Sequence, residues 1–97
     1  MLSSKQRAAL RSMANKLDPI FQIGKGGITE EIIKQLDLAI EARELIKLTV
    51  LESAGLDVRA AGDELSKALR AEPVQTIGRK VVLYRRNHEN TRIELPR

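Results

Sequence analysis

The four residues Gly24-Lys25-Gly26-Gly27 are the part of the sequence best suited to bind a ligand. Glycines let the main chain approach a ligand closely. The segment runs into the start of an expected helix, whose free N–H groups and dipole attract anions. Lys25 adds a mobile positive charge at the same place. The alternative, which the segment alone leaves open, is an ordinary strand-to-helix turn that needs glycine for its dihedral angles.

The glycine segment does not match the common nucleotide-binding motifs. No G-x-x-x-x-G-K-[ST] string of a P-loop occurs in the sequence. The dinucleotide fingerprint G-x-G-x-x-G begins well with Gly24 and Gly26, but Thr29 occupies its third glycine position. The chain is also too short for two mononucleotide-binding halves. A Gly-x-x-Gly loop of this sort clamps the nucleic-acid backbone in KH domains, and this is the ligand chemistry that the segment would serve if it is more than a turn.

Residues for catalysis or metal binding are scarce. Cysteine is absent, which excludes a thiolate metal site and a cysteine nucleophile. The single histidine, His88, lies in a polar C-terminal segment without the partners of a triad or a zinc site. Glu30 and Glu31 suit the first turn of a helix better than acid-base chemistry. We therefore expect no enzymatic activity, no metal and no cofactor.

The charges are unevenly distributed along the chain. Residues 1–27 hold five Lys/Arg and one acid, residues 28–78 hold six and ten, and residues 79–97 hold six and two. If the two basic ends meet in the fold, they form one basic face that suits a polyanion. The alternative is a set of solvated surface charges.

The elements that position these residues follow from periodicity and capping signals. Ser3 and Gln6 predict a capping box, Thr29 and Asp57 predict two further helix starts, and Gly78-Arg79 predicts a hairpin turn. The expected helices cover residues 3–16, 29–44 and 57–72, and the expected strands cover residues 20–23, 45–51, 74–77 and 80–85. This α-β-α-β-α-β-β order predicts an α/β (α+β) fold with a mixed four-stranded sheet and helices packed on it. We expect one domain over residues 1–97, with a polar C-terminal tail at 87–97.

Five blocks of sequence, in order and at consistent spacing, resemble the CRM domain family, named for chloroplast RNA splicing and ribosome maturation. The similarity is strongest to its stand-alone bacterial members of the YhbY type. The blocks are residues 23–29, 44–48, 74–78, 82–85 and 93–96. The resemblance implies a fold similar to the C-terminal domain of translation initiation factor three. It also implies RNA binding through a Gly-x-x-Gly loop, which maps onto Gly24, Lys25, Gly26 and Gly27, and through neighbouring basic residues. Bacterial members associate with precursors of the large ribosomal subunit, and plant relatives act in organelle intron splicing.

The residues and the resemblance together predict a monomeric RNA-binding protein of ribosome assembly, whose partner is ribosomal RNA of the large-subunit precursor (pre-50S). Phosphate contacts are expected from the loop and from Arg7, Arg11, Lys16, Lys47, Arg85 and Arg86. We expect a bacterial cytoplasmic location with no membrane and no small-molecule substrate, because the sequence has no signal peptide and no apolar run of the ~20 residues that cross a bilayer. The alternative is a small protein-interaction module that uses the acidic middle segment or an exposed sheet edge without direct RNA contact.

Overall fold

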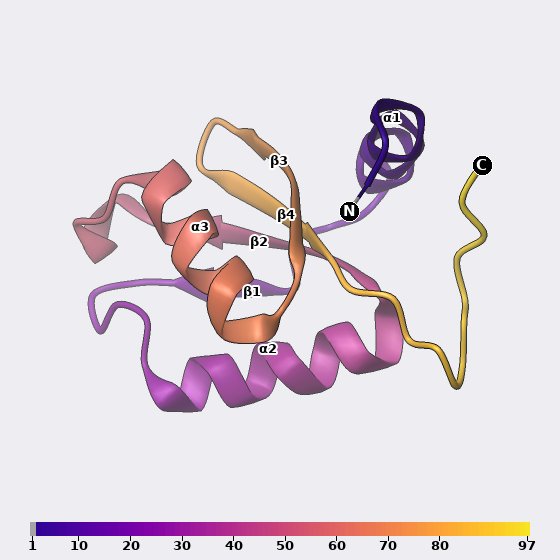
Figure 1. Cartoon of the computed structure of the whole chain (residues 1–97). Helices are drawn as coiled ribbons and strands as arrows, with labels where there is room; N and C mark the ends of the chain where they lie inside the picture. Colours follow the sequence, from indigo (N-terminus) through magenta and orange to yellow (C-terminus); the bar gives the residue numbers. More distant parts are fainter. Residues whose placement is uncertain (1) are drawn as a thin grey trace.

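Four strands form one mixed sheet, and three helices cover its two faces (Figure 1). The computed structural model describes residues 2–97. The elements are α1 (Ser4–Ala14), β1 (Phe21–Ile23), α2 (Glu30–Arg43), β2 (Leu45–Val50), the short 3₁₀ turn η1 (Glu52–Ala54), α3 (Val58–Leu69), β3 (Glu72–Ile77) and β4 (Lys80–Tyr84). The strand order is β1-β2-β4-β3, with β1 parallel to β2 and the other pairs antiparallel. The predicted fold class and element order are confirmed, whereas η1 was not predicted.

The three helices begin at the capping residues that the sequence indicated. The side chain of Ser3 accepts the N–H of Gln6 at 3.1 Å, and the side chain of Gln6 accepts the N–H of Ser3 at 3.0 Å. The Thr29 hydroxyl accepts the N–H of Ile32 at 3.2 Å, and Asp57 caps α3 in the same way. Each cap contributes about 1 kcal/mol to helix stability. The sequence therefore determines locally where α1, α2 and α3 begin.

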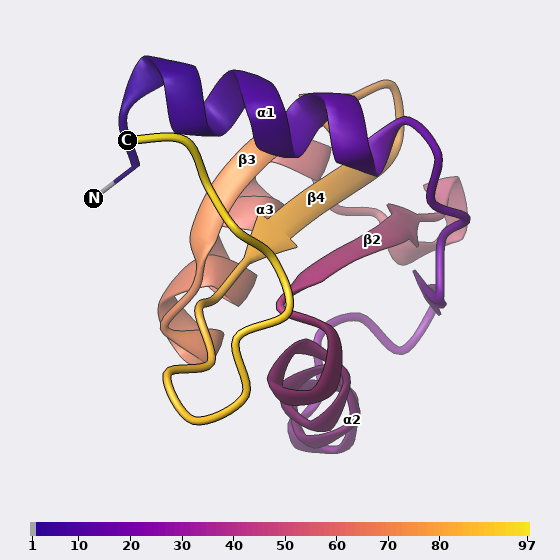
Figure 2. The ribbon, with the colours of Figure 1, turned by 90° about the vertical axis from the view of Figure 1, so that its right-hand side faces the viewer.

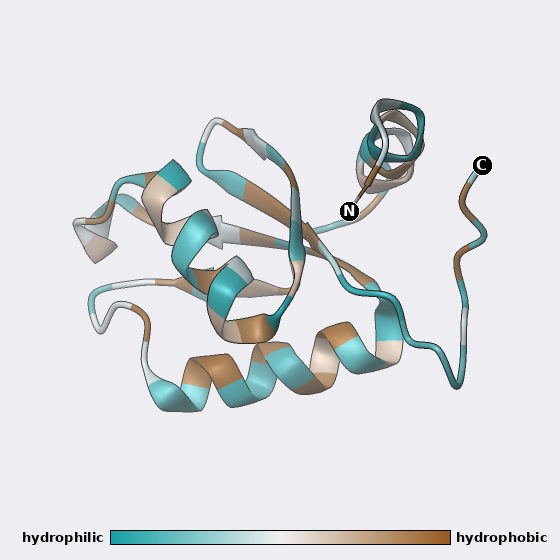
Figure 3. Ribbon diagram, viewed as in Figure 1, coloured by the Kyte–Doolittle hydropathy of each residue, from teal (hydrophilic) through white to brown (hydrophobic). Residues whose placement is uncertain are grey.

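The sheet is buried on both faces, by two separate groups of apolar side chains. One group lies between the sheet and the helices α2 and α3. It contains Ile23, Leu36, Ile40, Ile46, Leu48, Leu65, Leu69 and Leu83. The other group lies between the sheet and α1, and contains Leu10, Ala14, Leu45, Val74, Val82 and Tyr84. Figure 3 shows apolar residues concentrated along β4 and on the sheet-facing side of α2. The predicted alternation of β2 is confirmed, because Leu48 is fully buried while Lys47 and Thr49 are only partly covered.

The C-terminal tail packs beside α1 and brings the two basic ends of the chain together (Figure 2). Ile93 and Leu95 pack against the apolar group under α1. The side-chain amide of Gln6 donates a hydrogen bond to the Pro96 carbonyl at 3.1 Å. The acidic middle segment supplies α2 and α3 on the opposite face. The first residues of the chain and its tail therefore lie side by side, as the prediction of a basic face requires, whereas Lys25 lies apart from them in the loop after β1.

The boundary between α3 and β3 differs from the prediction. The helix ends at Leu69, and Arg70 turns the chain with a φ of +56°. Glu72 then pairs with Tyr84, so β3 starts where the sequence predicted the end of a helix. Pro73 is accommodated because β3 is an edge strand with a register irregularity after it. Proline was correctly taken as ending the helix, but it also belongs to the strand that follows.

Candidate nucleic-acid interface

The loop Gly24–Gly27 connects β1 to α2 at one end of the sheet (Figure 1). The N–H of Gly27 donates to the Gly24 carbonyl at 2.9 Å, which closes a tight turn with Lys25 and Gly26 exposed at its tip. Gly27 has a φ of +71°, a left-handed conformation that favours glycine. A Cβ atom built at Gly26 would meet nothing within 4 Å. One glycine is therefore needed for the turn, and another leaves the main chain open to a ligand.

The base of the loop is braced by β2 and by the β3–β4 turn. The N–H of Leu51 donates to the Ile23 carbonyl at 2.8 Å. The guanidinium of Arg79 in turn donates to the carbonyls of Val50 at 2.6 Å and Leu51 at 3.1 Å. Sequence reasoning treated Arg79 only as a turn residue, because these partners lie about thirty positions away and leave no local signal. Arg79 thus holds the end of β2, which in turn is hydrogen-bonded to the last residue of β1.

The start of α2 is less suited to an anion than the loop itself. The Thr29 hydroxyl already accepts one of the free N–H groups of the first turn. Glu30 and Glu31 place two carboxylates in that turn, where they interact favourably with the helix dipole but repel phosphate. Lys25 and the exposed loop amides are therefore the groups that can meet a phosphate.

Four of the predicted cations have exposed side chains that are available to a ligand. They are Lys25 in the loop, Arg11 and Lys16 at the end of α1, and Arg86 after β4. Within residues 2–97, these side chains make no hydrogen bond or ion pair. They are distributed between the loop and the face formed by α1 and the tail, so they do not form one compact patch.

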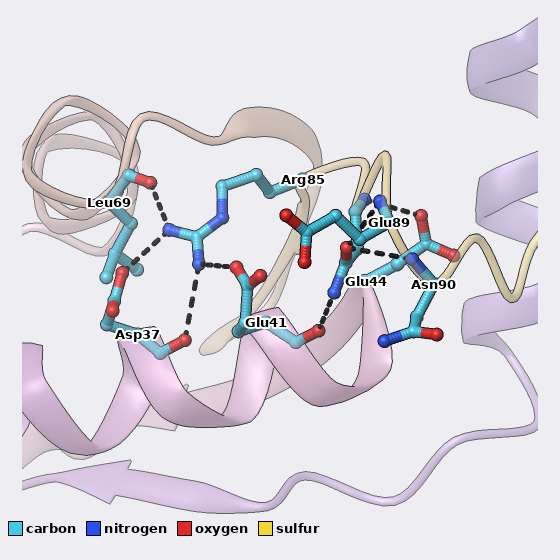
Figure 4. A network of polar contacts seen from close by, with 8 residues as sticks. Asp37, Glu41, Glu44, Leu69, Arg85, Glu89 and Asn90 are labelled. Carbon is cyan, nitrogen blue, oxygen red and sulfur yellow. Dashed lines mark hydrogen bonds and ion pairs between the residues drawn. The ribbon is translucent and has the colours of Figure 1, made fainter.

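Arg85 has a different place from the one predicted. Its guanidinium forms ion pairs with Asp37 at 2.7 Å and Glu41 at 2.9 Å, and it donates to the Leu69 carbonyl at 2.8 Å (Figure 4). The Arg85 side chain is only 19% exposed. It joins the end of β4 to α2 and to the end of α3, and so it serves the fold.

Arg7 and Lys47 are also occupied by main-chain carbonyls. Arg7 donates to the carbonyl of Pro73, which ties α1 to β3. The ammonium group of Lys47 donates to the carbonyls of Ala14 at 3.2 Å and Leu17 at 3.3 Å, at the C-terminal end of α1 where a cation interacts favourably with the helix dipole. We therefore leave Arg7, Lys47 and Arg85 out of the proposed interface.

Glu44 is a buried carboxylate that sequence reasoning missed. It follows α2 with a φ of +66° and is 0% exposed. Its carboxylate accepts the N–H groups of Asn87 and Ile93 at 2.8 Å each, and also that of Arg92. Burial acts to raise the pKa of Glu44, but the three N–H donors and the nearby Arg86 outweigh it and hold the pKa below the ordinary value. No local pattern distinguishes this glutamate from a solvated residue at a helix end.

The other side chains of metal-binding type lie apart. Within residues 2–97, no group of three or more histidine, aspartate or glutamate side chains is placed to hold a metal ion. His88 is exposed on the tail.

None of the helices in the described part of the chain has the length and apolar composition needed to cross a membrane.

The sequence profile of the CRS1 / YhbY (CRM) domain matches residues 2–85. The chain is 50% identical over 96 residues to the Probable RNA-binding protein YqeI of Bacillus subtilis, covering 99% of this chain and 100% of that protein. It is 34% identical to an RNA-binding protein of Haemophilus influenzae, covering 99% of this chain and 96% of that protein.

A solved structure has the same fold. The solution structure of the hypothetical protein SAV1595 from Staphylococcus aureus superimposes with a TM-score of 0.79 at 49% identity. The match covers 99% of this chain and 100% of the other. The fold is therefore shared along the whole length of a related bacterial protein.

Proposed function

This chain belongs to the CRS1 / YhbY (CRM) domain family, and we propose that it is a non-enzymatic RNA-binding protein of the bacterial cytoplasm. Its proposed target is ribosomal RNA of the large-subunit precursor, where it acts in ribosome assembly. The names of the relatives support the RNA-binding part, since those from B. subtilis and H. influenzae are described as RNA-binding proteins. The ribosomal target follows from the resemblance given above.

The observation that carries the proposal is the form of the Gly24–Gly27 turn. Its tip presents the Lys25 ammonium group and the open main chain of Gly26, and its base is hydrogen-bonded to Leu51, whose carbonyl accepts from Arg79. Amide N–H groups and one mobile cation at a protruding turn suit a phosphate backbone, which is contacted without reading bases. Arg11, Lys16 and Arg86 extend the positive surface toward the two chain ends.

The test is fluorescence anisotropy of labelled large-subunit ribosomal RNA fragments at several salt concentrations. The native protein is compared with Lys25→Glu, which reverses the charge at the loop tip. We expect weaker binding and a plot of log affinity against log salt whose slope is shallower by about 1, because a phosphate contact is lost.

The matched control is Lys67→Glu, which makes the same charge reversal on an exposed residue of α3, on the face opposite α1. Circular dichroism checks that both variants are folded. Equal RNA affinity of the Lys25→Glu and Lys67→Glu variants would show that the loop is not part of the interface. If native protein binds neither naked RNA nor pre-ribosomal particles, the proposed function is wrong, and the protein-interaction alternative takes its place.

A further inference from the structure

A groove of about 630 Å³ opens between the C-terminal ends of α1 and α2 and the tail. Its floor is apolar and includes Met13, Leu17, Ile20 and Ile93. Leu17 is 37% exposed. The volume lies in the usual range for ligand sites, which are mostly apolar with a few polar groups that orient the ligand. The groove is distinct from the Gly24–Gly27 loop and shares no residue with it.

The rim of this groove is positively charged. Lys16, Arg43 and Arg92 lie on it with exposed side chains. In the part of the chain that the structure describes, none of these three side chains has an ion-pair partner. Asp18 is the one carboxylate among the lining residues. The groove thus complements a ligand with an apolar face and a negatively charged backbone.

A second, smaller hollow leads from the groove toward the loop. It is lined by Pro19, Ile20, Phe21, Gln22 and Thr49, and so shares Ile20 with the groove. Most of these residues lie along β1 or directly before it. This strand is three residues long and spans about 10 Å at the usual rise of a strand. Gly24 follows this strand directly. The groove and the loop therefore lie at the two ends of one short edge strand.

We propose that the groove binds an unstacked base of a single-stranded RNA segment whose backbone continues along β1 to the Gly24–Gly27 loop. Lys16, Arg43 and Arg92 meet the phosphates on either side of that base. The proposal rests on the proposed RNA binding and names its substrate class, because paired bases in a duplex cannot enter an apolar groove.

The composition of the groove explains how a protein with few aromatic residues can hold a base. The sequence contains two aromatics, Phe21 and Tyr84, and both pack against the core. Aliphatic side chains and the soft thioether of Met13 replace them as the apolar surface. The phosphate contacts then add the salt dependence expected of any backbone binder.

The experiment uses a single-stranded RNA of about eight nucleotides, a common size for single-strand sites. The fluorescent base 2-aminopurine is placed at each position in turn, and a fully paired RNA hairpin provides the comparison. We expect native protein to change the fluorescence at one or two positions only, where the base leaves its neighbours and enters the groove.

The variant Leu17→Asp places a negative charge on the groove floor. We expect it to abolish the fluorescence change and to weaken single-strand binding about tenfold, from the usual contribution of one bound base, while hairpin binding is unchanged. Leu38→Asp is the matched control, because Leu38 is 72% exposed on α2 and does not line the groove. Both positions are exposed, so both variants should fold, and thermal unfolding checks this.

Each outcome decides the proposal. Equal single-strand binding by Leu17→Asp and Leu38→Asp overturns the groove site. If Lys25→Glu still weakens binding in that case, the proposed function stands without it. A third outcome is that an acidic peptide with one central leucine displaces the RNA, although RNA binding itself changes the fluorescence at no position. That result assigns the groove to a protein partner and also overturns the proposal. Absence of all RNA binding overturns the proposed function itself, and the groove site with it.

Discussion

The main-chain N–H of Ile93 lies 2.8 Å from a carboxylate oxygen of Glu44, a residue 49 positions earlier in the chain. Two further N–H groups of the tail point to the same carboxylate. Because Ile93 also packs under α1, this one buried glutamate holds the tail against the core. It joins the end of α2 to the segment that closes the second face of the sheet.

Replacing Glu44 with glutamine should weaken the attachment of the tail to the core. An amide offers one acceptor oxygen in place of two and presents its own N–H₂ group to N–H donors. We expect a loss of about 2 kcal/mol in the free energy of unfolding, the usual worth of hydrogen bonds to a charged group. Chemical denaturation measures it, and hydrogen exchange should show faster exchange at Asn87 and Ile93. A variant as stable as native protein would mean that the tail is held by its apolar contacts alone.

Glu44 also predicts how stability depends on pH. Its folded pKa lies below the ordinary value of 4.5, so the folded state prefers the charged carboxylate. The resulting stabilisation is fully present above pH 4.5 and is lost as pH falls through the lower folded pKa. Urea unfolding of native protein and Glu44→Gln across this interval should show the difference between them shrinking toward acid. A constant difference would contradict the assignment.

Arg85 and Arg86 are neighbours with opposite expected roles. Arg85→Ala should cost about 1–2 kcal/mol of stability, because it breaks two ion pairs with half-exposed acids and a hydrogen bond to the Leu69 carbonyl. That corresponds to a melting temperature lower by several degrees. Arg86→Ala should lower the melting temperature less than Arg85→Ala, because it removes only a charge near Glu44, and should lower the salt slope of RNA binding. The reverse pattern would exclude Arg86 from the interface.

Variants of Gly26 and Gly27 distinguish the role of glycine in the turn from its role in contact with a ligand. Gly27→Ala forces an alanine into a φ of +71° and should cost about 1 kcal/mol of stability. Gly26→Ala meets no neighbour and should be neutral for folding. If RNA approaches the main chain at the tip, the Gly26 variant should nevertheless bind more weakly. Unchanged affinity there would leave Lys25 as the only contact at the tip.

Tyr84 carries a buried hydroxyl with no hydrogen-bond partner in the described structure. Burial raises the pKa of this phenol, and the negative charge of Glu44 raises it further. Removing an unpaired buried polar group costs nothing in hydrogen bonding. Tyr84→Phe should therefore be as stable as native protein, or more stable by up to about 1 kcal/mol. A clear loss of stability would show that the hydroxyl has a partner, such as a bound water molecule.

The elements of the fold could be predicted because their signals are local. The caps at Ser3, Thr29 and Asp57 and the alternation along β2 depend on residues a few positions apart. The placement of the charged residues could not be predicted in this way. Arg85 and Arg86 look equivalent in sequence, and only the fold decides that one meets Asp37 and Glu41 while the other remains exposed.

The parts of the candidate site also differ in whether a local sequence signal predicts them. The Gly24–Gly27 loop was found from its glycines, because a turn with a positive φ requires them locally. The brace formed by Arg79 and the groove beside Leu17 could not be found. Both are assembled from segments far apart in the chain, so neither leaves a short-range pattern.

The packing of α1 has a consequence for the order of events on the ribosome that synthesises this protein. This helix precedes β2, β3, β4 and the tail in the chain, so it emerges before the elements against which it packs. Its apolar side chains Leu10, Met13 and Ala14 therefore stay exposed until nearly all of these residues have been translated. Docking of α1 is therefore a late step, and the uncovered apolar side chains expose nascent chains to aggregation or to chaperone capture in this interval.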